Sequence, residues 1–183
     1  MSNDSNLVKI YNTDGGLEKY IPREDLNYHE DIIYSVHTLV FTEDEHAILV
    51  KMPAIGTVYA GKFGSAFGSE QLKGEGDEDT IYRIMREKLN LEQLPEPITQ
   101  AEPKKVVDKF FFSDDVLINF FSAYTIILDQ PLLSLTNNPK DEFVDFDLDT
   151  LKKKIDREPE KFTPTFLEIW RRGKDNILEQ LNG

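Results

Sequence analysis

The side chains best suited to chemistry lie within residues 61–91, which read GKFGSAFGSEQLKGEGDEDTIYRIMREKLNL. The acids of this stretch include Glu70, Glu75, Asp77, Glu78 and Glu87, and its cations include Arg83 and Lys88. Hard divalent cations prefer carboxylate oxygens. A Gly-rich loop before a helix can cradle phosphate with its backbone N–H groups. The stretch therefore indicates a site for a cation, a phosphate or both.

The same stretch predicts a helix over residues 77–90. Apolar side chains recur at i, i+3, i+4 and i+8, as Ile81, Ile84, Met85 and Leu89, which is a helical period. Three acids at 77–79 suit a helix start. The simplest interpretation is an amphipathic helix on which Glu87 and Lys88 are solvated.

One face of this helix is where a metal site would be built. Carboxylates at offsets i, i+3 and i+4 lie on the same face and can jointly hold Mg²⁺. Here those positions are Ile84, Glu87 and Lys88. One carboxylate beside an apolar residue and an ammonium is a poor cation site, and Lys88 could instead neutralise Glu87 or contact a phosphate directly.

Residues 69–91 resemble the signature of the Nudix superfamily, G-x5-E-x7-R-E-U-x-E-E-x-G-U, where U is apolar. The matching residues are Glu75, Arg83, Met85, Glu87 and Leu91. The departures are Ser69 and Asn90 at the two Gly positions, and Ile84 and Lys88 at two of the Glu positions. The resemblance implies that two helix carboxylates that bind metal in this superfamily are missing here, so the box is degenerate.

Nearly the whole chain resembles the MutT-like and isopentenyl-diphosphate-isomerase-like branch of that superfamily. This implies an α/β (α+β) fold in which a mixed β-sheet is sandwiched between helices. It also implies residual catalytic roles for Glu75, Arg83 and Glu87, and ligand-binding roles for Gly68, Ser69 and Lys88. No metal or other cofactor is expected, although Glu75 and Glu87 would hold Mg²⁺ if hydrolase activity were retained.

Three functions are open at this point. The leading hypothesis is a Nudix-like protein that hydrolyses diphosphates weakly or not at all and binds a small phosphorylated ligand or a protein partner, because one lost catalytic group costs roughly two to four powers of ten in rate. An active Mg²⁺-dependent pyrophosphohydrolase would need an acidic site rebuilt from Glu70, Glu75, Asp77, Glu78 and Glu87. The third function is an interaction scaffold without a ligand. If only the ligands are missing, Ile84→Glu combined with Lys88→Glu should create activity.

The composition limits the classes of partner that the protein can bind. The 183 residues carry 21 Lys and Arg against 34 Asp and Glu, a net charge of -13, which disfavours nucleic acid polymers and anionic lipid. The chain has no cysteine and no apolar run of the roughly 18 residues that span a membrane. We therefore expect a cytoplasmic protein with no membrane contact. A homodimer could form through the C-terminal helix that carries Trp170.

The remaining elements follow from local patterns. We expect one domain over residues 1–183, with disorder over 1–6, a hairpin over 7–21 and a final helix over 164–181. Residues 32–41 are dense in β-branched and aromatic side chains, which is typical of a buried central strand. His37 within that strand is predicted to be a hydrogen-bonded core residue. Residues 93–105, rich in Pro and charge, indicate a surface connection.

Overall fold

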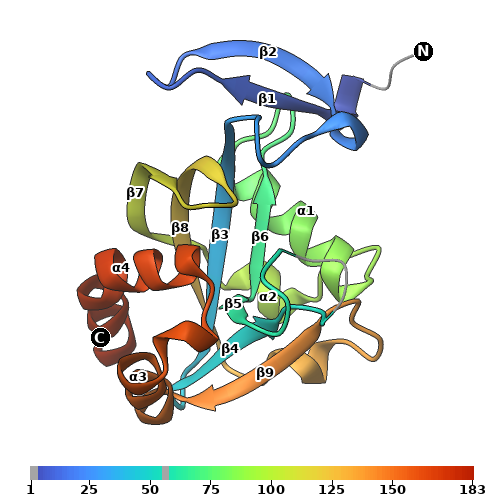
Figure 1. The fold of residues 1–183 in the computed structure, drawn as a ribbon. Helices are drawn as coiled ribbons and strands as arrows, with labels where there is room; N and C mark the ends of the chain where they lie inside the picture. The colour runs from blue at the N-terminus through green and yellow to red at the C-terminus, as the bar shows by residue number, and fades with distance from the viewer. Residues whose placement is uncertain (1–3, 55–57) are drawn as a thin grey trace.

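A mixed β-sheet lies between two layers of helices in the computed structural model, which describes residues 4–54 and 58–183 (Figure 1). The seven-stranded sheet has the order β5-β4-β3-β8-β7, with β6 paired to β3 and β9 paired to β4. Its strands are β3 (Ile33–Thr42), β4 (His46–Lys51), β5 (Phe63–Ser65), β6 (Phe67–Glu70), β7 (Lys104–Ser113), β8 (Ile118–Leu128) and β9 (Glu142–Asp147).

Strand β3 is the centre of the sheet. It pairs in parallel with β8 from Ile33 opposite Asn119 to Thr42 opposite Leu128. On its other edge it pairs antiparallel with β6 and then with β4. All residues of β3 are buried except His37, which is partly buried. Burial on both faces explains the nearly continuous apolar run of this segment.

Helices cover both faces of the sheet. Helices α1 (Asp77–Leu89) and α2 (Glu96–Gln100) pack on one face, and α3 (Leu148–Arg157) and α4 (Pro164–Asn182) pack on the other (Figure 1). This arrangement confirms the predicted α/β fold with a mixed sheet between helices.

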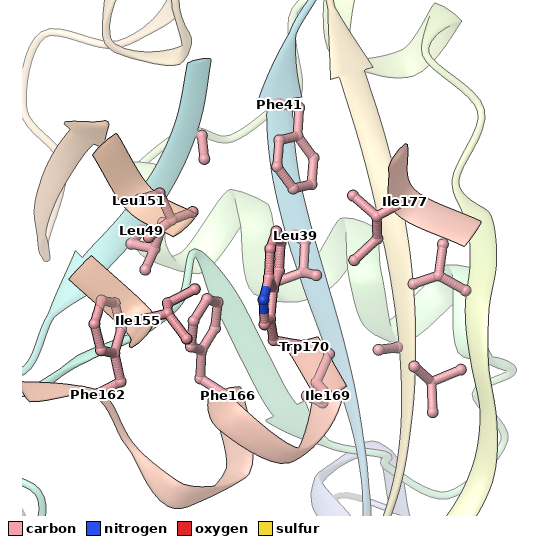
Figure 2. Packing of buried hydrophobic residues seen from close by; sticks show 14 of the residues in the cluster. Leu39, Phe41, Leu49, Leu151, Ile155, Phe162, Phe166, Ile169, Trp170 and Ile177 are labelled. Carbon is pink, nitrogen blue, oxygen red and sulfur yellow. The ribbon is translucent and has the colours of Figure 1, made fainter. Parts of the chain in front are cut away.

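The core under α4 is aromatic. Phe162, Phe166 and Trp170 share one apolar cluster with the strand residues Leu39 and Phe41, and Figure 2 shows Trp170 beside Leu39. The rings of Phe166 and Trp170 stack with centroids 6.5 Å apart. Since Trp170 is only 5% exposed, the aromatic face of α4 packs on the sheet of its own chain. Trp170 is therefore not available for contact with a second copy, and a homodimer through α4 stays a prediction.

Both C-terminal helices begin at side-chain caps. The Asp147 carboxylate accepts a hydrogen bond from the Thr150 N–H at 2.9 Å, and the Thr163 hydroxyl accepts one from the Phe166 N–H at 3.2 Å. Each bond satisfies one N–H that lacks an intrahelical acceptor. Within residues 4–54 and 58–183, no helix is long and apolar enough to cross a membrane.

The N-terminal hairpin forms a separate two-stranded sheet of β1 (Leu7–Tyr11) and β2 (Leu17–Pro22), in agreement with the expected hairpin over 7–21. Short 3₁₀ turns flank it, η1 (Asp4–Asn6) and η2 (Arg23–Asp25). The expected disorder over 1–6 is therefore wrong for 4–6, and residues 1–3 lie outside the described part of the chain. The surface connection over 93–105 contains the short helix α2. Two further turns are η3 (Leu132–Leu135), between β8 and β9, and η4 (Pro159–Lys161), between α3 and α4.

Candidate functional site

Arg83 joins the residues that the sequence singles out. Its Nε lies 2.6 Å from Glu75 Oε1, and its Nη1 lies 3.4 Å from Glu87 Oε1. Its Nη2 donates to the Glu70 carbonyl at 2.8 Å, which ties α1 to the end of β6. The structure thus brings Glu75, Arg83 and Glu87 together, with the guanidinium between the two carboxylates.

Glu75 is held by more than this ion pair. Its Oε2 accepts hydrogen bonds from the Leu72 N–H and the Thr80 hydroxyl, both at 3.0 Å. Burial by itself raises the pKa of Glu75, but the Arg83 guanidinium and the Leu72 N–H outweigh it and hold the pKa below its ordinary value. Glu75 is therefore an anion with every oxygen engaged.

A second arginine, Arg23, closes the other side of the cluster. It comes from η2, just after the N-terminal hairpin, and its Nε makes a close ion pair with Glu70. Its Nη1 lies 3.3 Å from Glu87 Oε1. The Glu70 side chain is only 6% exposed, so its charge needs this partner. Two guanidinium groups thus link Glu70, Glu75 and Glu87 into one network.

The other two positions of the expected helix face are occupied differently. Ile84 is 2% exposed and belongs to the core under α1, with Ile81 and Met85. Lys88 Nζ lies 3.1 Å from Asp141 Oδ2, at the far end of α1. The burial of Ile84 agrees with its place in the predicted apolar stripe of the helix.

These residues do not fit a bound Mg²⁺ ion. Glu70, Glu75 and Glu87 already neutralise arginines, and Asp77 accepts hydrogen bonds from the hydroxyls of Tyr34 and Tyr124. Within the described part of the chain, no group of three His, Asp or Glu side chains is arranged to hold a metal ion. Four of the five acids that could rebuild a metal site, Glu70, Glu75, Asp77 and Glu87, thus make other contacts.

A pocket of about 450 Å³ opens on the α4 side of the sheet, beside β6. All three expected ligand-binding residues, Gly68, Ser69 and Lys88, line it. Its other walls are Tyr28, Ser35, His37, Met52, Val58, Tyr59, Glu70, Leu117, Asn119, Phe121, Thr163 and Thr165. An adjoining pocket of about 200 Å³ shares His37, Met52, Gly68, Lys88 and Thr163 with it. The two hollows therefore meet beside Lys88 and the start of α4.

His37 lies where the two pockets meet. Its Nδ1 is 3.2 Å from the Ser65 hydroxyl, and its ring stands edge-on to Phe121 at 5.2 Å. A Cβ on Gly68 would lie 2.8 Å from the imidazole Cε1, so this position has room only for glycine while the ring stays in place. His37 is hydrogen-bonded, as predicted, but it also lines the pocket.

Acid should destabilise the protein through His37. Burial lowers the pKa of this imidazole from 6.5 to about 4. Between pH 6.5 and pH 4 the imidazole is therefore protonated in the unfolded chain but not in the folded one. Stability that is complete above pH 6.5 is therefore lost as the pH falls toward 4. Urea unfolding measures the free energy of unfolding at pH 7 and at pH 5. Its decrease between the two should be roughly 2 kcal/mol larger for the wild type than for His37→Gln. Equal losses in the two proteins would contradict this assignment.

Sequence reasoning missed several residues of this region. Arg23 lies 47 residues from Glu70 and 64 from Glu87 along the chain, and no local pattern relates them. Tyr28 and Thr165 reach the pocket from a loop and from the first turn of α4. A signal existed only for Thr165, since Thr163-Pro164 predicts a helix start beside it.

Comparison with known proteins identifies the fold. Neither a family model nor a curated protein matches the sequence. Among solved structures, DR0079 from Deinococcus radiodurans is similar with a TM-score of 0.68 and 18% identity, over 91% of this chain and 98% of that chain.

Two further similar structures are those of a MutT protein and a Nudix hydrolase. The MutT protein from Methanosarcina mazei Go1 is similar with a TM-score of 0.58 and 14% identity, over 80% of this chain and 95% of that one. The Nudix hydrolase RenU from M. smegmatis gives a TM-score of 0.58 and 11% identity, over 93% and 96%. The chain therefore has the Nudix fold, as its mixed sheet between two helical layers already indicated.

Proposed function

We propose that this chain is a Nudix-fold protein that binds a small phosphorylated ligand and hydrolyses diphosphate bonds weakly or not at all. The observation that carries the proposal is the pairing of its glutamates: Glu70, Glu75 and Glu87 each contact an arginine. Metal-assisted attack of water on phosphorus requires carboxylates that hold the cation. Here the carboxylates balance guanidinium groups instead.

The two replaced positions reinforce this conclusion. Ile84 is buried in the core and Lys88 pairs with Asp141, so neither can act as a metal ligand. Each lost catalytic group costs roughly two to four powers of ten in rate. With both gone, the box over residues 69–91 is degenerate, and the fold is retained for binding.

The pocket supports a small ligand. Its volume of about 450 Å³ lies in the range of roughly 300 to 1,000 Å³ that is usual for small-molecule sites. Lys88 supplies a cation that suits a phosphate. A net charge of -13 disfavours nucleic acid polymers as partners and fits a cytoplasmic binding protein.

Thermal unfolding in the presence of ADP-ribose, a nucleotide sugar and a dinucleoside polyphosphate tests this proposal. At least one compound should raise the melting temperature, because a ligand that binds only the folded state stabilises it. The shift should be the same in EDTA and in millimolar Mg²⁺, and no phosphate-containing product should be released. Lys88→Gln should reduce the shift, whereas Lys153→Gln on the exposed face of α3 should not.

A second candidate, an active Mg²⁺-dependent hydrolase, would require the paired glutamates to exchange their arginine partners for the cation. Glu70, Glu75 and Glu87, three acids of the rebuilt site, share one network through Arg23 and Arg83. If Mg²⁺ or Mn²⁺ raises the melting temperature and diphosphates are cleaved, this candidate replaces the first. If no metal and no compound causes a shift, an interaction scaffold is the better description.

A further inference from the structure

We propose that the start of α4 and Lys88 form an anion subsite at the junction of the two pockets, which takes the phosphate of a phosphorylated ring compound. This inference rests on the proposed function and assigns the end of the pocket at which the charged group of the ligand lies. Lys88 at the end of α1 and Thr163 at the start of α4 each line both pockets.

The first turn of α4 offers donors without acceptors. The helix has 19 residues, with Thr163 as its N-cap and Pro164 at its first position. The Thr163 hydroxyl accepts a hydrogen bond from the Phe166 N–H. The Thr165 N–H, also in the first turn, has no intrahelical acceptor. The partial positive charge of a helix N-terminus favours an oxyanion there.

The Thr165 side chain is the second, independent observation. This residue is 4% exposed and lines the larger pocket, yet its hydroxyl is buried without a hydrogen-bond partner. A buried hydroxyl that makes no hydrogen bond is destabilising and is rare in folded proteins. A turn of the side chain about its Cα–Cβ bond would bring the hydroxyl to a ligand oxygen at this end of the pocket, which would satisfy it.

The charges at the junction suit an anion despite the acidity of the whole chain. Lys88 is bound to Asp141 at 3.1 Å on one side, but an ammonium has three donors, so others are left for a ligand. Glu70 is the acid among the residues that line the larger pocket, and it pairs with Arg23. His37 is neutral at pH 7, because burial lowers its pKa to about 4.

The rest of the larger pocket suits a ring. Tyr28, which is 42% exposed, lies among its lining residues with Tyr59 and Leu117. Aromatic side chains offer faces and edges on which a planar ring stacks. The Asn119 Oδ1 accepts the Ile33 N–H, so its NH₂ group is the part of the amide that can donate to ring atoms. A nucleoside monophosphate has both parts, a planar ring and a phosphate.

Titration of ¹⁵N-labelled protein with inorganic phosphate, at ionic strength held constant with chloride, tests the subsite. The Thr165 and Phe166 amide signals should move saturably. Lys88→Gln should weaken binding at least about tenfold, the loss expected for one charge-assisted hydrogen bond. Thr165→Val, which keeps the shape and removes the hydroxyl, should weaken it less, and Lys153→Gln should have no effect. Adenosine monophosphate should add shifts at Asn119 and Phe121.

Each other outcome overturns part of the proposal. If the amides of α4 do not move, or if chloride alone moves them equally, there is no phosphate subsite. If they move but adenosine monophosphate adds nothing at Asn119 and Phe121, the ring assignment fails. Should the compounds of the thermal assay bind while Thr165 and Lys88 are unaffected, the proposed function stands and this subsite does not.

Discussion

The Ile84→Glu variant is expected to lose roughly 4 kcal/mol of stability, a large part of the roughly 5 to 15 kcal/mol that is usual for a domain. Ile84 is 2% exposed and packs with Ile81, Met85 and Leu89, none of which has measurable exposure. A carboxylate placed there must either lose its hydration or displace the helix, and both are costly. Urea unfolding followed by circular dichroism measures the loss.

Matched variants separate this effect from helix propensity. Ile84→Leu keeps the apolar volume and should cost less than about 1.5 kcal/mol. Lys88→Glu changes a residue that is 39% exposed in its side chain and should cost only about 1 kcal/mol. A stable Ile84→Glu protein that binds Mg²⁺ would contradict our description of the site. Otherwise the double replacement at 84 and 88 cannot restore activity, because its first member disrupts the core.

Arg83→Met should be nearly as damaging, at about 3 to 5 kcal/mol. The Arg83 side chain is 13% exposed and that of Glu75 is 17% exposed, so the substitution leaves a largely buried carboxylate without its cation. It also removes the hydrogen bond to the Glu70 carbonyl. Equilibrium unfolding should show the loss, and its size should fall when the pH is lowered enough to protonate Glu75.

The control for Arg83 is an exposed ion pair of the same type. Arg171 lies 2.6 Å from Glu168 but is 65% exposed, so Arg171→Met should cost at most about 1 kcal/mol. Adding Glu75→Gln to Arg83→Met should recover part of the loss, because the buried charge is then gone. If Arg83→Met and Arg171→Met lose the same amount of stability, the ion-pair network around Arg83 is not a buried one.

Local sequence patterns predicted helices α1 and α4, whose positions depend on contacts between residues close in the chain. The 3.6-residue period indicated α1, and Thr163-Pro164 marked the start of α4, because both depend on neighbours within a turn or two. Helix α2 was missed since Pro95, Glu96 and Pro97 have the composition of a loop, and only the burial of Ile98 favours helix there.

Two interpretations of Ile84 were in conflict within the sequence itself. The helical period placed it in the apolar stripe, whereas alignment with the Nudix signature placed it in a metal site. The period was the better guide, because burial of an apolar side chain is a strong physical preference. Arg23 was beyond prediction, since its ion pairs with Glu70 and Glu87 exist only once the hairpin has docked on the sheet.

The parallel pairing of β3 with β8 has a consequence for how the chain reaches this structure. Ile33 lies opposite Asn119, 86 positions later, so a long loop must close before the centre of the sheet exists. On the ribosome, α1 emerges well before Ile126 and Leu128, which share its apolar cluster. Until they arrive, the apolar face of α1 can pack only on earlier strand residues such as Val36 and Phe67 and lacks the β8 part of its cluster. This is the interval in which a chaperone would protect the exposed apolar surface.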